Sequence, residues 1–130
     1  MPLRIWHTNQ FVFDLTMEHI IDATNKSLGR VASAAAVLLM GKNNESFVRN
    51  SAPKVSVHIT NASKANLTEK KRKEKKYMTY SGYPGGLKSE SLEELIIKKG
   101  SAEAFRKAVK GMLPKNKLAK VMMKNLKINE

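Results

Sequence analysis

Basic side chains near the C-terminus recur at intervals that place them on one side of a helix. The steps are three, four and three residues, so at about 100° per residue the side chains fall within about 80° of one another. The residues concerned are Lys117, Lys120, Lys124 and Lys127. An apolar stripe, which would face the core, lies about 170° away on the same helical wheel. It consists of Leu118, Val121, Met122 and Leu126.

These four lysines form what we call the lysine ridge, and the segment around them contains no acidic residue. Residues 104–129 hold eight basic side chains, namely Arg106, Lys107, Lys110, Lys115, Lys117, Lys120, Lys124 and Lys127. A solvated lysine face is the alternative interpretation. Such a face normally mixes charge signs, because opposite charges three or four residues apart stabilise a helix. We therefore interpret the ridge as a phosphate-binding surface.

A second dense run of basic residues lies in the middle of the chain. Residues 64–76 hold seven basic groups and two glutamates, and the centre of the run is Lys70, Lys71, Arg72 and Lys73. A run of this density predicts a mobile loop that becomes ordered on a polyanion. A solvated loop with no ligand is the alternative.

A glycine-rich segment, residues 81–88, follows this run. Its backbone N–H groups could approach a phosphate, and its tyrosine could stack on a base or ribose. The candidate contacts are Ser81, Gly82, Tyr83, Gly85, Gly86 and Lys88. The segment matches neither the dinucleotide-binding nor the Walker glycine pattern, so a plain turn is the alternative interpretation.

Residues that could perform catalysis are few and scattered. His7, His19 and His58 stand apart in the sequence, and the chain has no cysteine. By strand alternation, His58 lies on a polar face and is not expected to be a ligand. No constellation of a nucleophile with a base, and no metal-ligand spacing, is present. The sequence predicts neither an enzyme nor a cofactor or metal site.

The charge of the whole chain agrees with a polyanion partner. Lysine and arginine number 24 against 11 acidic residues, which gives a net charge of +13 and a pI of about 10.1. Nucleic acid is the first candidate partner, ahead of an anionic membrane surface or an acidic protein. We expect no membrane-spanning segment and no secretion signal. A length of 130 residues suits one domain, which we place at residues 19–130 after an N-terminal extension, residues 1–18.

The elements that would position these side chains alternate between strand and helix. Residues 19–23 predict a buried strand, Asn25 and Lys26 a turn, and Ser27 the N-cap of a helix that ends at Gly41. Residues 54–60 alternate apolar and polar side chains, which predicts a half-buried strand. A third strand is expected at residues 77–81.

The second half is predicted to be mostly helical. Ser91 and Glu94 form a capping-box pattern at the start of a helix that ends at Gly100. Another helix is expected at residues 101–110, a break at residues 111–114, and a last helix from Lys115. Together the elements predict an α/β domain.

Taken in order, several short sequence motifs resemble those of one family, the bacterial-type large-subunit ribosomal protein L13. They are residues 21–23, 27–33, 41–43, 61–64, 81–88, 108–118 and 126–128. The resemblance implies a single three-layer α/β/α domain with a small, mostly parallel, four-stranded sheet. It also implies binding to large-subunit ribosomal RNA, a role in early subunit assembly and no catalysis. RNA contact is implied for the 81–88 loop and for Arg30, Lys42, Lys110, Gly111, Met112, Pro114, Lys115, Lys117 and Lys120.

The chain departs from the family pattern in a few places. The usual Thr-Gly-Asp before the second strand is replaced by residues 50–53, and a Gly-Arg after Leu118 is replaced by Ala119 and Lys120. Lys120 keeps the charge but lacks the two-pronged guanidinium. The aromatic-Gly and His-containing tail common in the family does not follow in this sequence. No tail contact is therefore carried over, and a divergent bacterial or organellar lineage is expected.

The resemblance implies large-subunit ribosomal RNA and neighbouring ribosomal proteins as partners, with one copy per subunit, no homo-oligomer and no membrane. The expected location is the ribosome, in the cytoplasm or an organelle. A free RNA chaperone or translational repressor would share this chemistry and remains an alternative. A nucleotide-using α/β enzyme is the alternative from another functional class, but this sequence lacks the catalytic residues that such an enzyme would need.

Overall fold

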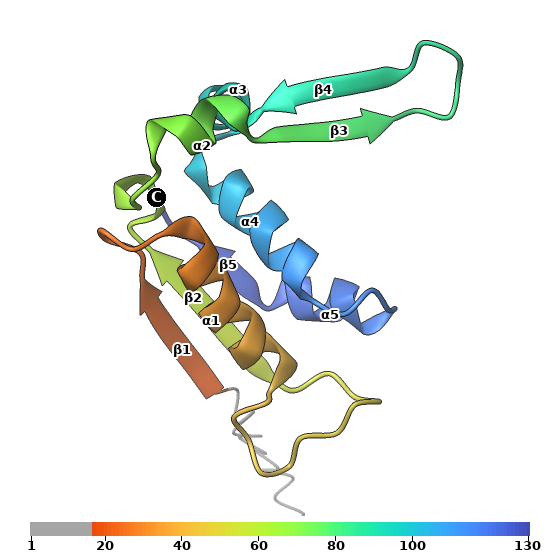
Figure 1. Cartoon of the computed structure of the whole chain (residues 1–130). Helices are drawn as coiled ribbons and strands as arrows, with labels where there is room; N and C mark the ends of the chain where they lie inside the picture. Colours follow the sequence, from red (N-terminus) through yellow and green to blue (C-terminus); the bar gives the residue numbers. More distant parts are fainter. Residues whose placement is uncertain (1–16) are drawn as a thin grey trace, which may run out of the picture.

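The structure is a computed structural model that describes residues 17–130, so His7 and most of the expected N-terminal extension lie outside it. The elements alternate along the chain as an α/β domain (Figure 1). They are β1 Met17–Asp22, α1 Leu28–Met40, β2 Val55–Thr60, a 3₁₀ turn η1 Ala62–Lys64, α2 Glu69–Glu74, β3 Lys76–Tyr80, β4 Leu87–Ser91, α3 Leu92–Lys99, α4 Ser101–Met112, α5 Leu118–Lys124 and β5 Leu126–Ile128.

A parallel sheet of three strands, in the order β1-β2-β5, forms the base of the fold. The central strand β2 buries Val55, Val57 and Ile59 on one face. The opposite face carries one row in which Ile20, His58 and Lys127 are register partners. Ile20 is 75% exposed there. The alternation predicted for β2, with His58 on the polar side, is therefore confirmed.

Helices α1 and α4 pack against each other over the apolar face of β2 (Figure 1). The largest fully buried side chain is Phe105 of α4, and Leu39 of α1 and Ile59 of β2 are equally enclosed. Helix α1 contributes small buried residues, Ala32 and Ala35 among them. One continuous core results, and no polar side chain of the described residues is buried in it.

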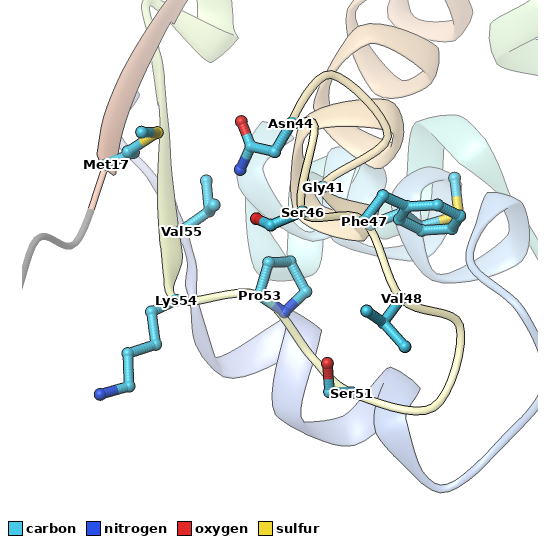
Figure 2. Close-up of a pocket in the computed structure, with 11 residues that line it drawn as sticks. Met17, Gly41, Asn44, Ser46, Phe47, Val48, Ser51, Pro53, Lys54 and Val55 are labelled. Atoms are coloured by element: carbon cyan, nitrogen blue, oxygen red, sulfur yellow. The ribbon is translucent and has the colours of Figure 1, made fainter.

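The ends of the helices follow local signals in the sequence. Gly41 ends α1 in the left-handed conformation, φ 72°, as predicted, and its N–H donates to the Leu38 carbonyl at 3.0 Å. A Cβ at Gly41 would also lie 2.9 Å from a ring carbon of Pro53, which Figure 2 shows beside it. Ser27 occupies the predicted N-cap position, although its side chain makes no capping hydrogen bond.

The N-terminus of α4 is capped from the far end of the chain. Gly100 precedes the helix with φ 85° and has no side chain to offer. The Glu130 carboxylate approaches from the C-terminus, and its Oε1 accepts from the Ala102 N–H at 3.4 Å. A carboxylate at this position also opposes the positive end of the helix dipole.

The α/β class and the mainly parallel sheet are confirmed, but the expected four strands become three. The other two strands, β3 and β4, pair only with each other as an antiparallel hairpin. The second helical layer is also not found among residues 17–130, because α1, α4 and α5 contact one another on the same face of the sheet. The opposite face carries Glu18, Asp22, Ser56, His58, Thr60 and Lys127. A face this polar gives a helix little apolar surface to bury.

Three local predictions are also corrected. Strand β1 is an edge strand whose side chains are exposed or half-buried, so it is not the buried strand expected. The basic run predicted to be a mobile loop contains the helix α2. The last helix is shorter than expected, because residues 126–128 leave it and pair with β2. The backbone groups of these residues can pair either within a helix or with the open edge of β2, and here they pair with β2.

Asp22 ties the end of β1 to η1 and makes stability depend on pH. Its Oδ1 accepts from Thr24 Oγ1 at 2.7 Å, from the Thr24 N–H at 3.0 Å and from Asn61 Nδ2 at 3.1 Å. The hydrogen bonds from the Thr24 side chain, then from Asn61 and the Thr24 backbone, lower the pKa of Asp22 from 3.8 to about 2.

We predict that Asp22→Ala lowers the free energy of unfolding near neutral pH. A lowered pKa stabilises the folded state above the unfolded pKa of 3.8, and that contribution disappears as the pH falls through about 2. The difference from the parent protein should therefore shrink between those pH values in urea titrations. Glu18→Ala on the same strand is the control, and a difference independent of pH would contradict the prediction.

Candidate nucleic-acid interface

A basic groove of about 610 Å³ runs between α4 and α5. Helix α4 lines it at positions i, i+3, i+4 and i+7, and α5 with the preceding loop does the same, so each helix presents one face. The lining residues are Glu103, Arg106, Lys107, Lys110, Pro114, Lys115, Asn116, Ala119, Lys120 and Met123. Of the predicted contacts, the groove therefore brings together Lys110, Pro114, Lys115 and Lys120.

A short connection sets the angle between the two helices. Helix α4 continues through Gly111 to Met112 and α5 begins only at Leu118, so the break covers residues 113–117 and lies further along the chain than the predicted 111–114. Leu113 is buried and anchors the connection to the core. At the start of α5, the Ala119 N–H donates both to the Asn116 Oδ1 at 3.1 Å and to the Asn116 carbonyl at 3.3 Å.

The lysine ridge is present on α5, with two corrections. Lys117, Lys120 and Lys124 are exposed, and Met122 on the other side is buried in the core. Lys127 belongs to β5 and projects from the polar face of the sheet. Val121, expected in the core, is 46% exposed, because α5 turns Ala119 and Met123 inward instead.

The positive charge of the groove is largely unneutralised. Arg106 donates to Glu103 at 2.9 Å, three residues away on the same helix. Lys107, Lys110 and Lys120 have no carboxylate partner among residues 17–130. Cations gathered without partners repel one another, so this face favours binding an anion.

Two further clefts connect with the groove through shared residues. Pro114 and Asn116 also line a cleft of about 360 Å³ that contains Lys42 and Arg49. Lys107 also lines a cleft that contains Lys71 and Lys75. Lys42, predicted from the family resemblance, is thus joined to the groove. Lys75 and Lys107 belong to the two basic segments noted in the sequence but were not predicted as individual contacts, and Arg49 lies in neither segment.

Other predicted contacts lie outside the groove, although Lys71, Gly111 and Met112 line the cleft that shares Lys107 with it. Arg30 lines a separate cleft of about 340 Å³ with Lys26, near the start of α1. Lys70, Lys71, Arg72 and Lys73 are exposed on α2. Gly111 is exposed on α4 with nothing within 4 Å of the position of a Cβ, and Met112 is 41% exposed.

The glycine-rich segment forms the tip of the β3–β4 hairpin, which extends away from the helices (Figure 1). Gly82 and Gly85 adopt positive φ angles of 87° and 75°. A Cβ at Gly86 would lie 3.0 Å from the Tyr83 carbonyl oxygen and would force the Ser81 hydroxyl to move, so the turn favours glycine there. Tyr83 is 75% exposed at the tip, where its ring can stack on a base.

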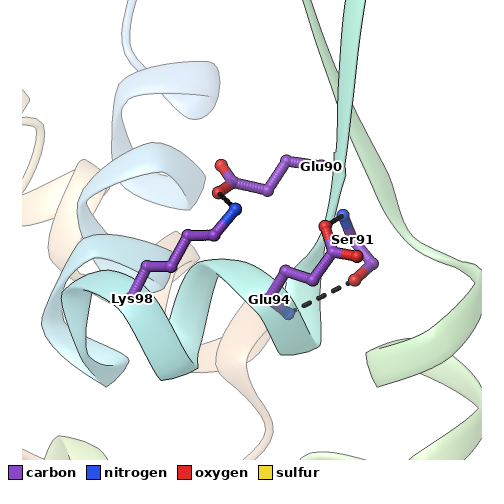
Figure 3. Close-up of polar contacts among 4 residues, drawn as sticks. All are labelled: Glu90, Ser91, Glu94 and Lys98. Carbon is purple, nitrogen blue, oxygen red and sulfur yellow. Dashed lines mark hydrogen bonds and ion pairs between the residues drawn. The ribbon is translucent and has the colours of Figure 1, made fainter.

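The base of the hairpin is fastened to α3 by polar contacts (Figure 3). The predicted capping box is present, because Ser91 Oγ accepts from the Glu94 N–H at 3.2 Å while Glu94 Oε2 accepts from the Ser91 N–H at 3.2 Å. Lys98 of α3 pairs with Glu90 of β4 at 3.2 Å. These contacts set the direction in which the hairpin leaves the body.

Other kinds of site are not evident in the part of the chain that the structure describes. No group of three or more histidine, aspartate or glutamate side chains is arranged to hold a metal ion within residues 17–130. In the same range, every helix is too short or too polar to cross a bilayer.

The fold and this surface define a small basic α/β domain suited to a polyanion. The family model described as Ribosomal protein L13 matches residues 16–130. The large ribosomal subunit protein uL13 of Treponema pallidum is 47% identical over 110 residues, which are 85% of this chain and 77% of that protein. Those of Kocuria rhizophila and Thermobifida fusca are 48% and 46% identical over the same share of this chain and over 74% and 73% of their own lengths.

The chain belongs to the ribosomal protein L13 family. This confirms the resemblance drawn from the sequence motifs, and it defines the chain as a structural protein and not an enzyme.

We predict that Ser91→Ala lowers the free energy of unfolding by about 1 kcal/mol, the usual cost of losing an N-cap side chain. Urea denaturation followed by circular dichroism measures the loss. Ser89→Ala, on the same strand and exposed, is the matched control. An equal loss in both variants would show that the capping box does not contribute.

Proposed function

We propose that this protein is a structural component of the large ribosomal subunit that binds large-subunit ribosomal RNA through the α4–α5 groove and the lysine ridge. The observation that carries the proposal is the set of lysines in the groove without acidic partners, in a member of a ribosomal protein family. A polyanion that enters the groove relieves their mutual repulsion and releases counterions.

The shape of the surface suits folded RNA. The groove offers cations on both walls, from α4 and from α5, and Arg106 adds a planar guanidinium that can bind a phosphate with two parallel hydrogen bonds. Of the ridge lysines, Lys120 lines the groove, while Lys117 and Lys124 are exposed outside it and can reach further RNA phosphates. Lys42 and Arg49 extend the contact past Pro114.

The hairpin serves a second, distant contact. Its tip carries Tyr83 and flexible glycines for an unpaired region of RNA. One face of the hairpin exposes Met78, Tyr80 and Leu87, which suits a neighbouring ribosomal protein. A protein with contacts this far apart can hold separate RNA segments together, which supports a role early in subunit assembly.

We predict that replacing Lys117, Lys120 and Lys124 together with Gln leaves the unfolding temperature nearly unchanged and weakens binding to a large-subunit RNA fragment. All three side chains are exposed, so folding loses little. The slope of log affinity against log salt should fall by about 2 to 3 if each lysine neutralises one phosphate. Filter binding across a salt series measures both quantities.

The matched control replaces Lys64, Lys99 and Lys127 with Gln, exposed lysines outside the groove and ridge. Both variants change the net charge from +13 to +10, since each loses three charges. Equal weakening in the two would show that only total charge matters. A large drop in the unfolding temperature of the first variant would show that the ridge is structural.

A free RNA chaperone or repressor would use the same lysines, so location separates the two functions. We predict that the protein sediments with large subunits when a lysate is fractionated on a sucrose gradient at low salt. It should leave them only at high salt. Recovery at the top of the gradient under all conditions would favour the free protein.

A further inference from the structure

A cleft of about 330 Å³ lies where the hairpin, α2 and α4 meet, and the proposed groove contact leaves it unused. Three lysines line it, Lys71, Lys75 and Lys107, and no carboxylate does. Its remaining wall is mostly apolar, with Leu28, Leu92 and Met112 among the side chains. The volume is at the lower end of the range for small-ligand sites, about 300 to 1,000 Å³.

Tyr77 of β3 is the central side chain of this cleft. Lys107 Nζ lies 4.4 Å from the centre of its ring and Lys75 Nζ lies 5.6 Å from it. Two positively charged ammonium groups therefore lie over one aromatic ring, and their attraction to the ring offsets only part of their mutual repulsion. An anion between the two ammonium groups would remove the remaining repulsion.

The hydroxyl group of Tyr77 adds a second, independent observation. Its oxygen is buried and has no hydrogen-bond partner among residues 17–130. A buried hydroxyl without a partner is destabilising, and a ligand oxygen or nitrogen that displaces the side chains covering it and accepts from it would relieve this cost. Burial also raises the pKa of Tyr77, so the group stays protonated and remains a donor.

We propose that this cleft binds one unpaired nucleotide of the ribosomal RNA, an inference that rests on the function proposed above. The phosphate lies among the three lysines, the base packs on the apolar wall beside the tyrosine ring, and the Tyr77 hydroxyl donates to the nucleotide. A bare anion would leave the apolar wall unused. A nucleotide inside a duplex could not enter, because its base is stacked and paired.

The position of Lys107 connects this site with the groove. Its side chain lines both, and it is half-buried between them. A single strand that leaves the groove along α4 can therefore place its next nucleotide in the cleft without losing cationic contact.

Tyr77→Phe tests the proposal, because it removes only the hydroxyl. We expect unfolding in urea to be unchanged or shifted to higher denaturant, since an unpartnered group is lost. We expect affinity for the RNA fragment to fall about tenfold, the loss of one hydrogen bond to a charged group. Tyr80→Phe, an exposed tyrosine on the same strand, is the control and should change neither.

A second variant and a chemical footprint complete the test. Lys75→Met, at a lysine that lines the cleft and not the groove, keeps the apolar stem and removes the charge, and we expect it to weaken binding as well. Footprinting with a base-modifying reagent should show one unpaired nucleotide protected by the parent protein and released in both variants, with other protections intact.

Three outcomes would overturn the inference. If both variants bind RNA and protect it as the parent does, the cleft inference fails and the proposed function stands. If the parent itself does not bind the RNA, both fail together. If an acidic peptide of a neighbouring protein, and not RNA, is held less tightly by Tyr77→Phe, the cleft is a protein-binding site.

Discussion

The central strand β2 is the constraint on which the rest of the structure depends. It receives β1 on one edge and β5 on the other, and its buried row of Val55, Val57 and Ile59 forms the floor of the core. Because the last residues of the chain must pair with β2, helix α5 has to end at Lys124. That ending holds α5 beside α4, and the groove between them exists because both helices are held to one sheet. The surface that carries the proposed function is thus fixed by backbone pairing on the other side of the core.

Helix α4 joins the core to the candidate interface. Phe105 and Val109 on one side are fully buried, while Arg106 and Lys110 on the other face the groove. Lys107 lies between the two and reaches Tyr77 of the hairpin. Concentrated positive charge destabilises a free domain through self-repulsion. Under the proposed function this cost is tolerated, since RNA would neutralise the charge when the protein is assembled with it.

Much of the fold was predictable wherever the signal is local. Gly41 ends α1 with the left-handed cap expected of it, Ser91 and Glu94 form the capping box, and β2 alternates as its sequence indicates. Of the two hairpin strands, the sequence predicts only β3. The sequence of β4, Leu-Lys-Ser-Glu-Ser, consists of residues with little strand preference. Its pairing with β3 supplies the missing stability. The basic run at residues 64–76 is predicted to be a mobile loop because its charge density favours disorder, whereas the structure contains helix α2 at residues 69–74 of this run, packed beside α3.

By itself, the sequence determined the class of fold, the caps at Gly41 and Ser91, the positive face of α5 and the family, since these depend on residue type and on spacing along one element. Only the tertiary structure decided that Lys127 belongs to a strand and that Val121 is exposed. It also brought Lys71, Lys75 and Lys107 around Tyr77. The reason is that a strand needs a backbone partner and a cleft needs several walls, and both come from distant parts of the chain. Spacing within one element carries no information about which distant element will supply them.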